Sequence, residues 1–190
     1  MTLSHLFAVR SSWLLRSSLG LALAGLLAGC AGPNVQDYAQ QQPTMDLREY
    51  FNGPLTAHGI FTDRSGRVVK RFTVQMTGRW EGDNGTLDEH FLYSDGTTQR
   101  RVWRLRHLGG GRYVGTADDV VGEALGEAAG NAFHWKYTLA LLVDGSVWNV
   151  ALDDWMYRMD ARTLLNRSTM RKFGLHLGEV TLVMSKTSQE

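Results

Sequence analysis

The sequence predicts an all-β fold, in which a single antiparallel barrel of about 8–10 strands follows a short N-terminal helical turn. Three observations predict it. From residue 55 onward, apolar and polar side chains alternate with a period of two, which is typical of strands with one buried face. Pairs such as Asp95-Gly96 and Asp144-Gly145 separate these runs and are typical of hairpin turns. No run after Phe51 has the length and period of a helix, so helical connections are not expected.

The residues ahead of this region have the features of a secretory signal. Arg10 and Arg16 flank an apolar run at residues 21–28, which is shorter than the ~20 apolar residues of a membrane-spanning helix. The run ends in Leu-Ala-Gly-Cys at residues 27–30, a motif that resembles the bacterial lipobox. In signals of that kind, cleavage occurs before the cysteine and its thiol is acylated, so the resemblance implies that Cys30 carries palmitate or a similar chain.

This resemblance sets the expected location of the protein. Residues 1–29 are expected to be a removed signal peptide, and Cys30 is the only cysteine, so it has no partner for an internal disulfide. Several acyl chains give stable anchoring, whereas a single chain binds membranes only marginally. Ala31 follows Cys30 where an inner-membrane lipoprotein would carry Asp. We therefore expect a lipid-anchored protein of the bacterial outer membrane that faces the periplasm.

The rest of the chain has the size and charge of one globular domain. Residues 30–45 are rich in Gln and contain two prolines, which predicts a flexible tether, and residues 46–190 are the expected barrel domain. Removing residues 1–29 takes away two of the 20 basic residues and none of the 19 acidic ones, so the remainder is close to neutral. Nucleic-acid binding needs a strongly basic surface, so no nucleic-acid partner is expected.

A single helical turn is predicted between the tether and the first strand. Asp46 can cap it, with Glu49 three residues later completing a capping box. The turn should stop at the Asn-Gly-Pro sequence of residues 52–54. We interpret this element as a lid or plug for one end of the barrel.

The first strands are predicted at residues 55–63 and 68–80, joined by a turn at residues 63–66. The second strand is long and has one apolar face, interrupted only by Lys70 and Gly78. Gly78 is expected to permit the sharp bend that barrel strands need. The apolar face consists of Val68, Phe72, Val74, Met76 and Trp80.

The next hairpin, near Asp95-Gly96, offers two registers. A two-residue turn would set apolar residues of one strand opposite arginines of the other, whereas a three-residue loop with Gly96 left-handed shifts the pairing by one residue. We favour the three-residue loop because it unites the apolar side chains. It sets Glu89 opposite Arg101 on the inward face, either as a structural ion pair or as part of a polar ligand site. The predicted pairs are Leu87 with Trp103, Glu89 with Arg101, and Phe91 with Gln99.

The later strands are predicted at residues 112–118, 133–143, 147–160, 163–173 and 178–185. Between the first two lies a glycine-rich stretch, residues 118–132, with glycines at every fourth position from Gly122 to Gly130. It is too short and charged for a membrane span, and it lacks the Gly-Lys-Ser/Thr ending of a phosphate loop. We expect an excursion in which backbone segments pack closely.

Several motifs of this region resemble the DUF3833 family of bacterial lipoproteins, whose function is unknown. They are residues 122–137, the run Asp153-Asp154-Trp155-Met156-Tyr157, the pair Asn166-Arg167 and residues 170–174. The likeness extends from about Phe51 to Lys186. It implies a lipocalin-like barrel and, because family members are often encoded near enzymes that modify membrane fatty acids, a connection with lipid. It implies no catalytic residues.

The sequence offers one candidate for a catalytic site. Asp118-Asp119 and Asp153-Asp154 are adjacent acidic pairs, and one member of each can face inward, so an acid/base site would need Asp118 and Asp154 to meet across the barrel. The alternative is that these acids end strands or pair with basic residues. The histidines have no metal-ligand spacing and no Gly-x-Ser-x-Gly elbow is present, so no metal and no cofactor is predicted.

Aromatic residues at strand spacing are the strongest functional signal. They either fill the barrel or line a pocket for one small ligand, and inward polar groups among them favour the pocket. The candidate ligand-binding residues are Glu89, Arg101, Trp103, Trp135, Tyr137, Asp154, Trp155 and Tyr157.

We therefore expect a binding module whose barrel holds or transfers a fatty acid or lipid-like molecule, in preference to an enzyme. The second hypothesis is an enzyme that acts on a membrane lipid or fatty acid with Asp118 and Asp154 as acid and base. The third is an envelope interaction protein with a filled core and a surface site near Asn166-Arg167.

Overall fold

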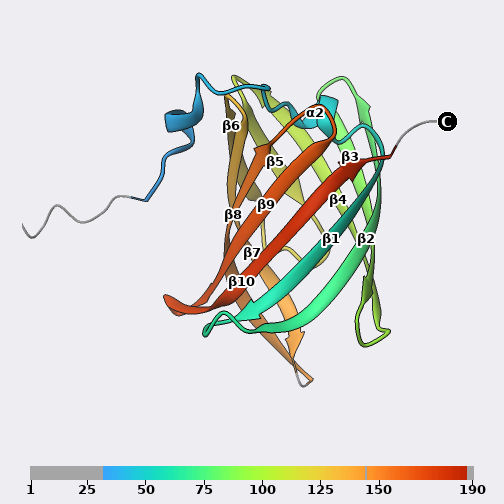
Figure 1. The fold of residues 1–190 in the computed structure, drawn as a ribbon, viewed down its shortest axis with the longest axis vertical. Helices are drawn as coiled ribbons and strands as arrows, with labels where there is room; N and C mark the ends of the chain where they lie inside the picture. Colours follow the sequence, from blue (N-terminus) through green and yellow to red (C-terminus); the bar gives the residue numbers. More distant parts are fainter. Residues whose placement is uncertain (1–31, 144, 188–190) are drawn as a thin grey trace, which may run out of the picture. The chain divides into compact units, whose positions relative to one another are not determined.

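A computed structural model describes residues 32–143 and 145–187, and within these ranges ten antiparallel strands form one closed barrel (Figure 1). Each strand pairs with its neighbours in sequence, and β1 closes the barrel against β10. The predicted all-β antiparallel barrel is confirmed. Within the described ranges, no helix is long and apolar enough to cross a membrane. The predicted signal peptide and Cys30 lie outside the described residues.

The first half of the barrel comprises β1 (Gly53–Asp63), β2 (Val68–Glu81), β3 (Asn84–Tyr93), β4 (Thr98–Gly109) and β5 (Arg112–Thr116). The second half comprises β6 (Ala124–Ala129), β7 (Ala132–Val143), β8 (Ser146–Arg158), β9 (Thr163–Lys172) and β10 (Leu175–Lys186). Two short helical elements precede the strands, the 3-10 helix η1 (Val35–Tyr38) and the α-helix α2 (Leu47–Tyr50).

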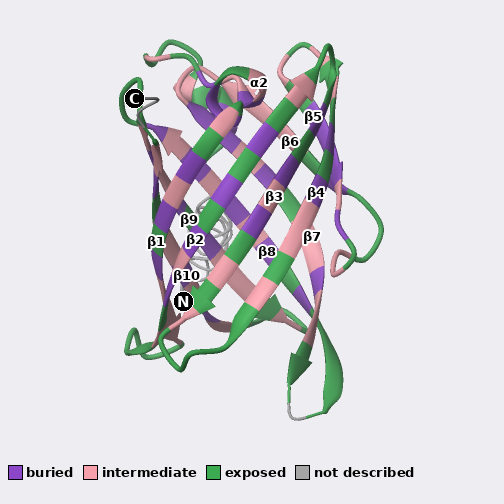
Figure 2. Ribbon diagram, turned by 90° about the vertical axis from the view of Figure 1, so that its right-hand side faces the viewer, coloured by how far each residue is buried: buried purple, intermediate pink, exposed green. Residues whose placement is uncertain are grey.

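Alternating burial along the strands places their apolar faces inside the barrel (Figure 2). On β2, Phe72, Val74 and Met76 are buried, whereas the intervening residues are more exposed. Gly78 was expected to permit a bend, but the structure gives a more direct reason for it. A Cβ atom there would lie 1.5 Å from the carbonyl oxygen of Phe51, so glycine allows the segment after α2 to approach the strand.

The β3–β4 hairpin has the register of the three-residue loop. Leu87 lies opposite Trp103, Glu89 opposite Arg101, and Phe91 opposite Gln99, as predicted. Gly96 has a φ of 83°, a left-handed conformation that glycine adopts without steric cost. Because the register sets which face each side chain occupies, this hairpin fixes the polar residues of the barrel interior.

The glycine-rich stretch contains a strand of its own. β5 ends at Thr116, two residues earlier than predicted, and the chain re-enters the sheet as β6. The expected close packing is present, since a Cβ at Gly126 would lie 2.4 Å from the ring of Phe133. At Gly130 it would lie 1.7 Å from the carbonyl oxygen of Tyr38. The glycines thus let η1 and the side chains of Phe133 and Trp135 pack directly against the β6 backbone and the turn that follows it.

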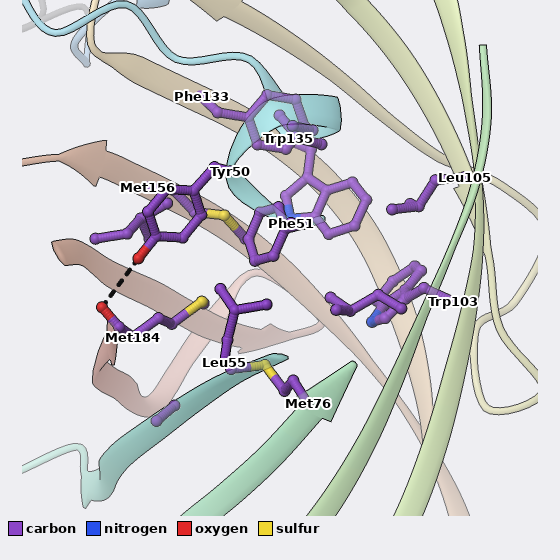
Figure 3. Packing of buried hydrophobic residues seen from close by; sticks show 14 of the residues in the cluster. Tyr50, Phe51, Leu55, Met76, Trp103, Leu105, Phe133, Trp135, Met156 and Met184 are labelled. Carbon is purple, nitrogen blue, oxygen red and sulfur yellow. Dashed lines mark hydrogen bonds between the residues drawn. The ribbon is translucent and has the colours of Figure 1, made fainter. Parts of the chain in front are cut away.

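Helix α2 closes one end of the barrel, as the lid interpretation anticipated (Figure 3). The Asp46 side chain caps it by accepting a bond of 2.8 Å from the backbone N–H of Arg48. Tyr50 is fully buried, and its hydroxyl donates to the carbonyl oxygens of Arg162 (2.9 Å) and Met184 (3.0 Å). Glu49 does not complete a capping box, because it pairs instead with Arg158 at 2.7 Å.

Residues 34–45 lie against the barrel, which differs from the predicted flexible tether over residues 30–45. The ring of Tyr38 packs on those of Trp155 and Tyr157, with centroids 5.9 and 5.4 Å apart. A compact unit of the chain accordingly begins at Asn34. Composition suggested a tether because Gln and Pro are common in linkers, but a few aromatic and apolar contacts are enough to hold such a segment in place.

Candidate ligand cavity in the barrel

A cavity of about 140 Å³ lies inside the barrel. Its apolar lining comes from α2 and from most strands, and consists of Leu47, Phe51, Phe61, Phe72, Leu87, Phe91, Trp103, Leu105, Phe133, Trp135, Leu139, Leu141, Leu152, Met156, Met170, Val180, Leu182 and Met184. Its polar lining consists of Glu89, Tyr93, Gln99, Arg101, Tyr137, Asp154, Asn166 and Ser168. An apolar enclosure with a few convergent polar groups is the usual composition of a small-molecule site.

Asp154 forms the best-satisfied polar cluster of the cavity. It is 3% exposed, and its carboxylate accepts from Trp135 Nε1 at 2.8 Å and from Ser168 Oγ at 2.7 Å. The Tyr137 hydroxyl donates to it at 3.3 Å, and the Asn166 amide donates to its other oxygen. Burial raises the pKa of Asp154, and these four donors oppose that rise. The cluster therefore fixes one wall of the cavity.

Glu89 differs from Asp154, because one oxygen of its buried carboxyl group has no hydrogen-bond partner. Its Oε2 atom makes no hydrogen bond, and the nearest cation, Arg101 Nη1, is 3.8 Å away. Burial raises the pKa of Glu89 to about 7, since the charged form loses its hydration. Buried polar atoms normally have partners, so an unpaired one that faces a cavity indicates a place for a ligand or a water.

Arg101 is held mainly by Asp119 instead of by Glu89. Its Nε lies 3.0 and 2.9 Å from the two Asp119 oxygens, and its Nη2 donates to Oδ2 at 2.7 Å. Gln99 also donates to Asp119, at 3.3 Å. The predicted Glu89–Arg101 pair therefore exists as a long contact inside a larger network, which leaves Arg101 Nη1 facing the unpaired oxygen of Glu89.

Closely packed aromatic rings form part of the cavity wall. The ring centroids of Trp103 and Trp135 are 4.6 Å apart, and Tyr137 meets Trp103 edge-on at 5.3 Å (Figure 3 shows both tryptophans). Large aromatic side chains supply apolar surface with few rotatable bonds, so this wall is rigid.

Six of the eight candidate residues line the cavity, and two do not. Glu89, Arg101, Trp103, Trp135, Tyr137 and Asp154 all face inward. Their role in binding stays a prediction.

The prediction that Trp155 and Tyr157 line the cavity is wrong, because both lie on the outer face of β8. The ring of Trp155 stacks on His134 with a centroid distance of 4.0 Å, and both aromatic residues lie beneath Tyr38. Neighbours in a strand point to opposite faces, so an inward Asp154 requires an outward Trp155.

The acid/base hypothesis for Asp118 and Asp154 is also wrong in this geometry. The Asp118 side chain is 92% exposed and pairs with Arg104 on the outer surface at 3.2 Å. Its neighbour Asp119 is the inward member of the pair. The expectation that one Asp of each adjacent pair faces inward holds, but the chosen member of the first pair is the outward one.

The sequence interpretation missed three polar residues of the interior, Asp119, Asn166 and Ser168. Asn166 was assigned to a surface site with Arg167, yet it is 2% exposed. Alternation along residues 164–170 contains the signal, because Leu164, Asn166, Ser168 and Met170 share one face. The face could be recognised only with the β8–β9 register, which sets Asp154 opposite Ser168.

Metal coordination has no support in the described ranges, where no three His, Cys, Asp or Glu side chains gather in a suitable group. His134, for example, bonds to Asp153 on the outer surface at 2.9 Å.

A family model described as a protein of unknown function, DUF3833, matches residues 24–186. The chain belongs to the DUF3833 family. The match includes every strand of the barrel and every polar residue of the cavity. No functionally curated protein shows significant sequence similarity to this family member.

Solved structures share the barrel fold of this DUF3833 protein at low sequence identity. The S-type phycobiliprotein lyase CpeS from Guillardia theta superposes with a TM-score of 0.59 at 6% identity, over 83% of this chain and 100% of the lyase. A protein of unknown function from the DUF3598 family of Nostoc punctiforme gives 0.54 at 9% identity, over 83% of this chain and 53% of that one. At such identities the likeness shows the fold alone.

Proposed function

We propose that the barrel binds a hydrophobic molecule with one polar group, such as a fatty acid or another lipid-like compound. The observation that carries the proposal is the unpaired Glu89 oxygen in a largely apolar cavity. A filled structural core would leave no cavity of about 140 Å³ beside an unpaired buried carboxyl group. The same fold serves a phycobiliprotein lyase, so this kind of barrel is compatible with action on another molecule.

The size of the cavity limits what it holds. An apolar cavity of ~150 Å³ binds benzene, so about 140 Å³ accommodates a group of similar size without rearrangement. A longer chain must extend toward the end of the barrel opposite α2 or displace flexible lining such as Met170 and Met184. We therefore favour a ligand whose polar end and first few carbons occupy the cavity.

Glu89 and Arg101 together can recognise the polar end. Arg101 Nη1 offers a donor, and Glu89 Oε2 accepts when ionised and donates when protonated. A carboxylate fits between Arg101 and a protonated Glu89, whereas a hydroxyl group fits either form. The fatty acid is thus expected to bind best below about pH 7, where Glu89 is protonated.

The cellular setting is part of the proposal. The lipobox-like motif at residues 27–30 supports acylation of Cys30 and anchoring at the bacterial outer membrane. Such an anchor would hold the barrel near membrane lipid, where the protein binds or transfers its ligand.

A binding experiment with a cavity-filling variant tests the ligand proposal. The probes are decanoate and decanol, measured at pH 6 and pH 8 through the fluorescence of the tryptophans in the cavity wall. Met170→Trp fills part of the cavity and should weaken binding of both probes at least tenfold. Leu125→Trp makes a comparable change at a position that is 62% exposed on β6, and should leave binding unchanged.

Two results would count against the proposal. The first is that neither probe binds the unmodified chain up to its solubility limit. The second is that Met170→Trp, verified as folded by circular dichroism, binds as well as Leu125→Trp does.

A further inference from the structure

Two hairpin tips, β7–β8 and β9–β10, lie at the end of the barrel opposite α2 (Figure 1). Both tips carry large apolar side chains that are exposed. On the β7–β8 tip, Leu142 is 75% exposed and Val147 is 67% exposed. On the β9–β10 tip, Phe173 is 93% exposed and Leu175 is 70% exposed. Single exposed apolar residues are common on soluble proteins, but a contiguous cluster indicates a contact with something else.

The two tips adjoin through one contact. The last β8–β9 pair at this end is Ala151 with Arg171, so residues 146–150 of β8 extend beyond β9 toward the β7–β8 tip. The Nζ atom of Lys172 lies 3.7 Å from the ring centroid of Trp148, which joins the tips through a cation–π contact. We call Leu142, Val147, Trp148, Phe173 and Leu175 the tip patch.

The two-residue β9–β10 turn needs a positive φ at both of its central residues, and phenylalanine is an unusual choice for the first, Phe173. Its φ is 52°, and among the described residues it is the only one other than glycine with a positive φ. Bulky side chains rarely adopt this conformation, which is strained, and here the ring gains no burial in return. Asn or Gly would form this turn with less strain, so folding alone gives no reason for an exposed phenylalanine at this position.

The tip patch is continuous with the cavity. Trp148 lies directly opposite Leu141 in the β7–β8 ladder, and Leu141 lines the cavity. Leu139, Val150 and Leu152 form a second apolar cluster just inside, against which Leu141 packs. Apolar side chains therefore extend from the exposed tips to the interior.

We propose that the tip patch inserts into the surface of a lipid bilayer. Tryptophan and phenylalanine next to lysine and arginine are the residues that favour the membrane interface, where rings meet acyl chains and cations meet phosphates. Arg171 and Lys172 supply the cations, and Asp144 is the only acidic residue in the sequence of either tip. Two protruding tips also suit a bilayer better than a protein partner, which needs a broad complementary surface. The inference holds whether or not the cavity binds a ligand.

Vesicle partitioning tests the proposal in the full chain with Cys30→Ala, which removes the acylation site from every variant alike. The vesicles contain phosphatidylethanolamine and phosphatidylglycerol in a 3:1 ratio. The Phe173→Ser/Leu175→Ser variant should partition at least tenfold more weakly, whereas Leu125→Ser removes an exposed leucine from the side of the barrel and should change nothing. Equal partitioning of the two variants would overturn the proposal.

A second measurement keeps Phe173 and Leu175 and changes only Trp148. In vesicles of brominated lipid, the fluorescence difference between the parent chain and its Trp148→Phe variant reports Trp148 alone. Insertion predicts that this component is quenched and shifts to shorter wavelength on binding. An unquenched Trp148 in chain that is bound to vesicles would show that the tips stay in water, and would likewise overturn the proposal.

Discussion

Glu89 and Asp154 are two buried carboxyl groups in one cavity, and their surroundings give them different roles. Asp154 accepts four hydrogen bonds, so its charge is compensated within the protein. Glu89 has an unpaired oxygen and a cation only at 3.8 Å, so its charge is compensated poorly. Asp154 therefore organises the cavity wall, whereas Glu89 is the residue free to respond to a ligand or to pH.

Glu89 should make the stability of the protein depend on pH. Its pKa rises from the usual 4.5 to about 7 on folding, so the folded state holds this proton to higher pH than the unfolded chain. Its stabilising effect is complete below about pH 4.5 and is lost as the pH rises through about 7. Between pH 4 and pH 8, the free energy of unfolding should therefore fall by up to about 3 kcal/mol relative to Glu89→Gln.

Urea denaturation of the unmodified chain and of Glu89→Gln from pH 4 to pH 8 measures the difference in their free energies of unfolding. Taking the difference cancels the contributions of other titrating groups. Glu123→Gln, at an exposed position, serves as the control and should follow the unmodified chain at every pH. Parallel curves for the unmodified chain and Glu89→Gln would contradict the prediction.

Asp154 and Asp153 provide a matched pair, because they are adjacent and face opposite sides of β8. Asp154→Asn replaces an acceptor oxygen with a donor, so at least one of the four donors loses its partner inside the barrel. We expect a loss of about 2–4 kcal/mol in the free energy of unfolding. Asp153→Asn weakens the outer contacts with His134 and Lys136, and should cost less than about 1 kcal/mol. Equal losses in urea denaturation would be incompatible with the assigned faces.

At the scale of elements, the position of α2 depends on a single glycine in β2. The backbone after α2 lies so close to β2 that Gly78 has no room for a methyl group. Leu47 and Phe51 reach the cavity from this position and close it. The seal of the cavity is therefore set by a backbone contact as well as by apolar packing.

Gly78→Ala should displace α2 and destabilise the protein by at least about 2 kcal/mol. Trypsin should then cleave more quickly after Arg48, which lies in α2. Thr77→Ala changes the exposed neighbour on the same strand and should stay within about 0.5 kcal/mol of the unmodified chain. Unchanged stability and proteolysis in Gly78→Ala would show that α2 does not need this approach.

Strands with a strong alternation of apolar and polar residues could be predicted from the sequence. Side-chain positions that depend on which strands pair could not. The β3–β4 register followed from Gly96 and the alternation around Glu89, because only one register unites the apolar residues. Trp155 and Tyr157 share the aromatic character of the cavity residues, but strand parity places both on the outer face of β8. Strand pairing brings Ser168 to the cavity, and the loop after β5 brings Asp119 to Arg101; a single sequence specifies neither.

At the scale of the whole molecule, the last strand decides whether the barrel has edges. All pairings between consecutive strands are local, whereas β1 and β10 come together from opposite ends of the domain. Val180 and Met184 of β10 join the core, and the Tyr50 hydroxyl bonds to the Met184 carbonyl at 3.0 Å. Closure thus links the N-terminal plug to the C-terminal strand and removes both sheet edges.

Truncation after Gly174 should therefore abolish cooperative folding instead of shortening the barrel by one strand. It removes β10 and exposes the unpaired edges of β1 and β9, which favour association between chains. Truncation after Thr187 keeps all of β10 and should leave the urea transition and the monomer fraction unchanged. The near-ultraviolet circular dichroism of the Trp103–Trp135 pair and size-exclusion chromatography report the two effects. A shorter chain that is monomeric and unfolds cooperatively would contradict this prediction. It would mean that the remaining strands close into a barrel without the pairing between β1 and β10.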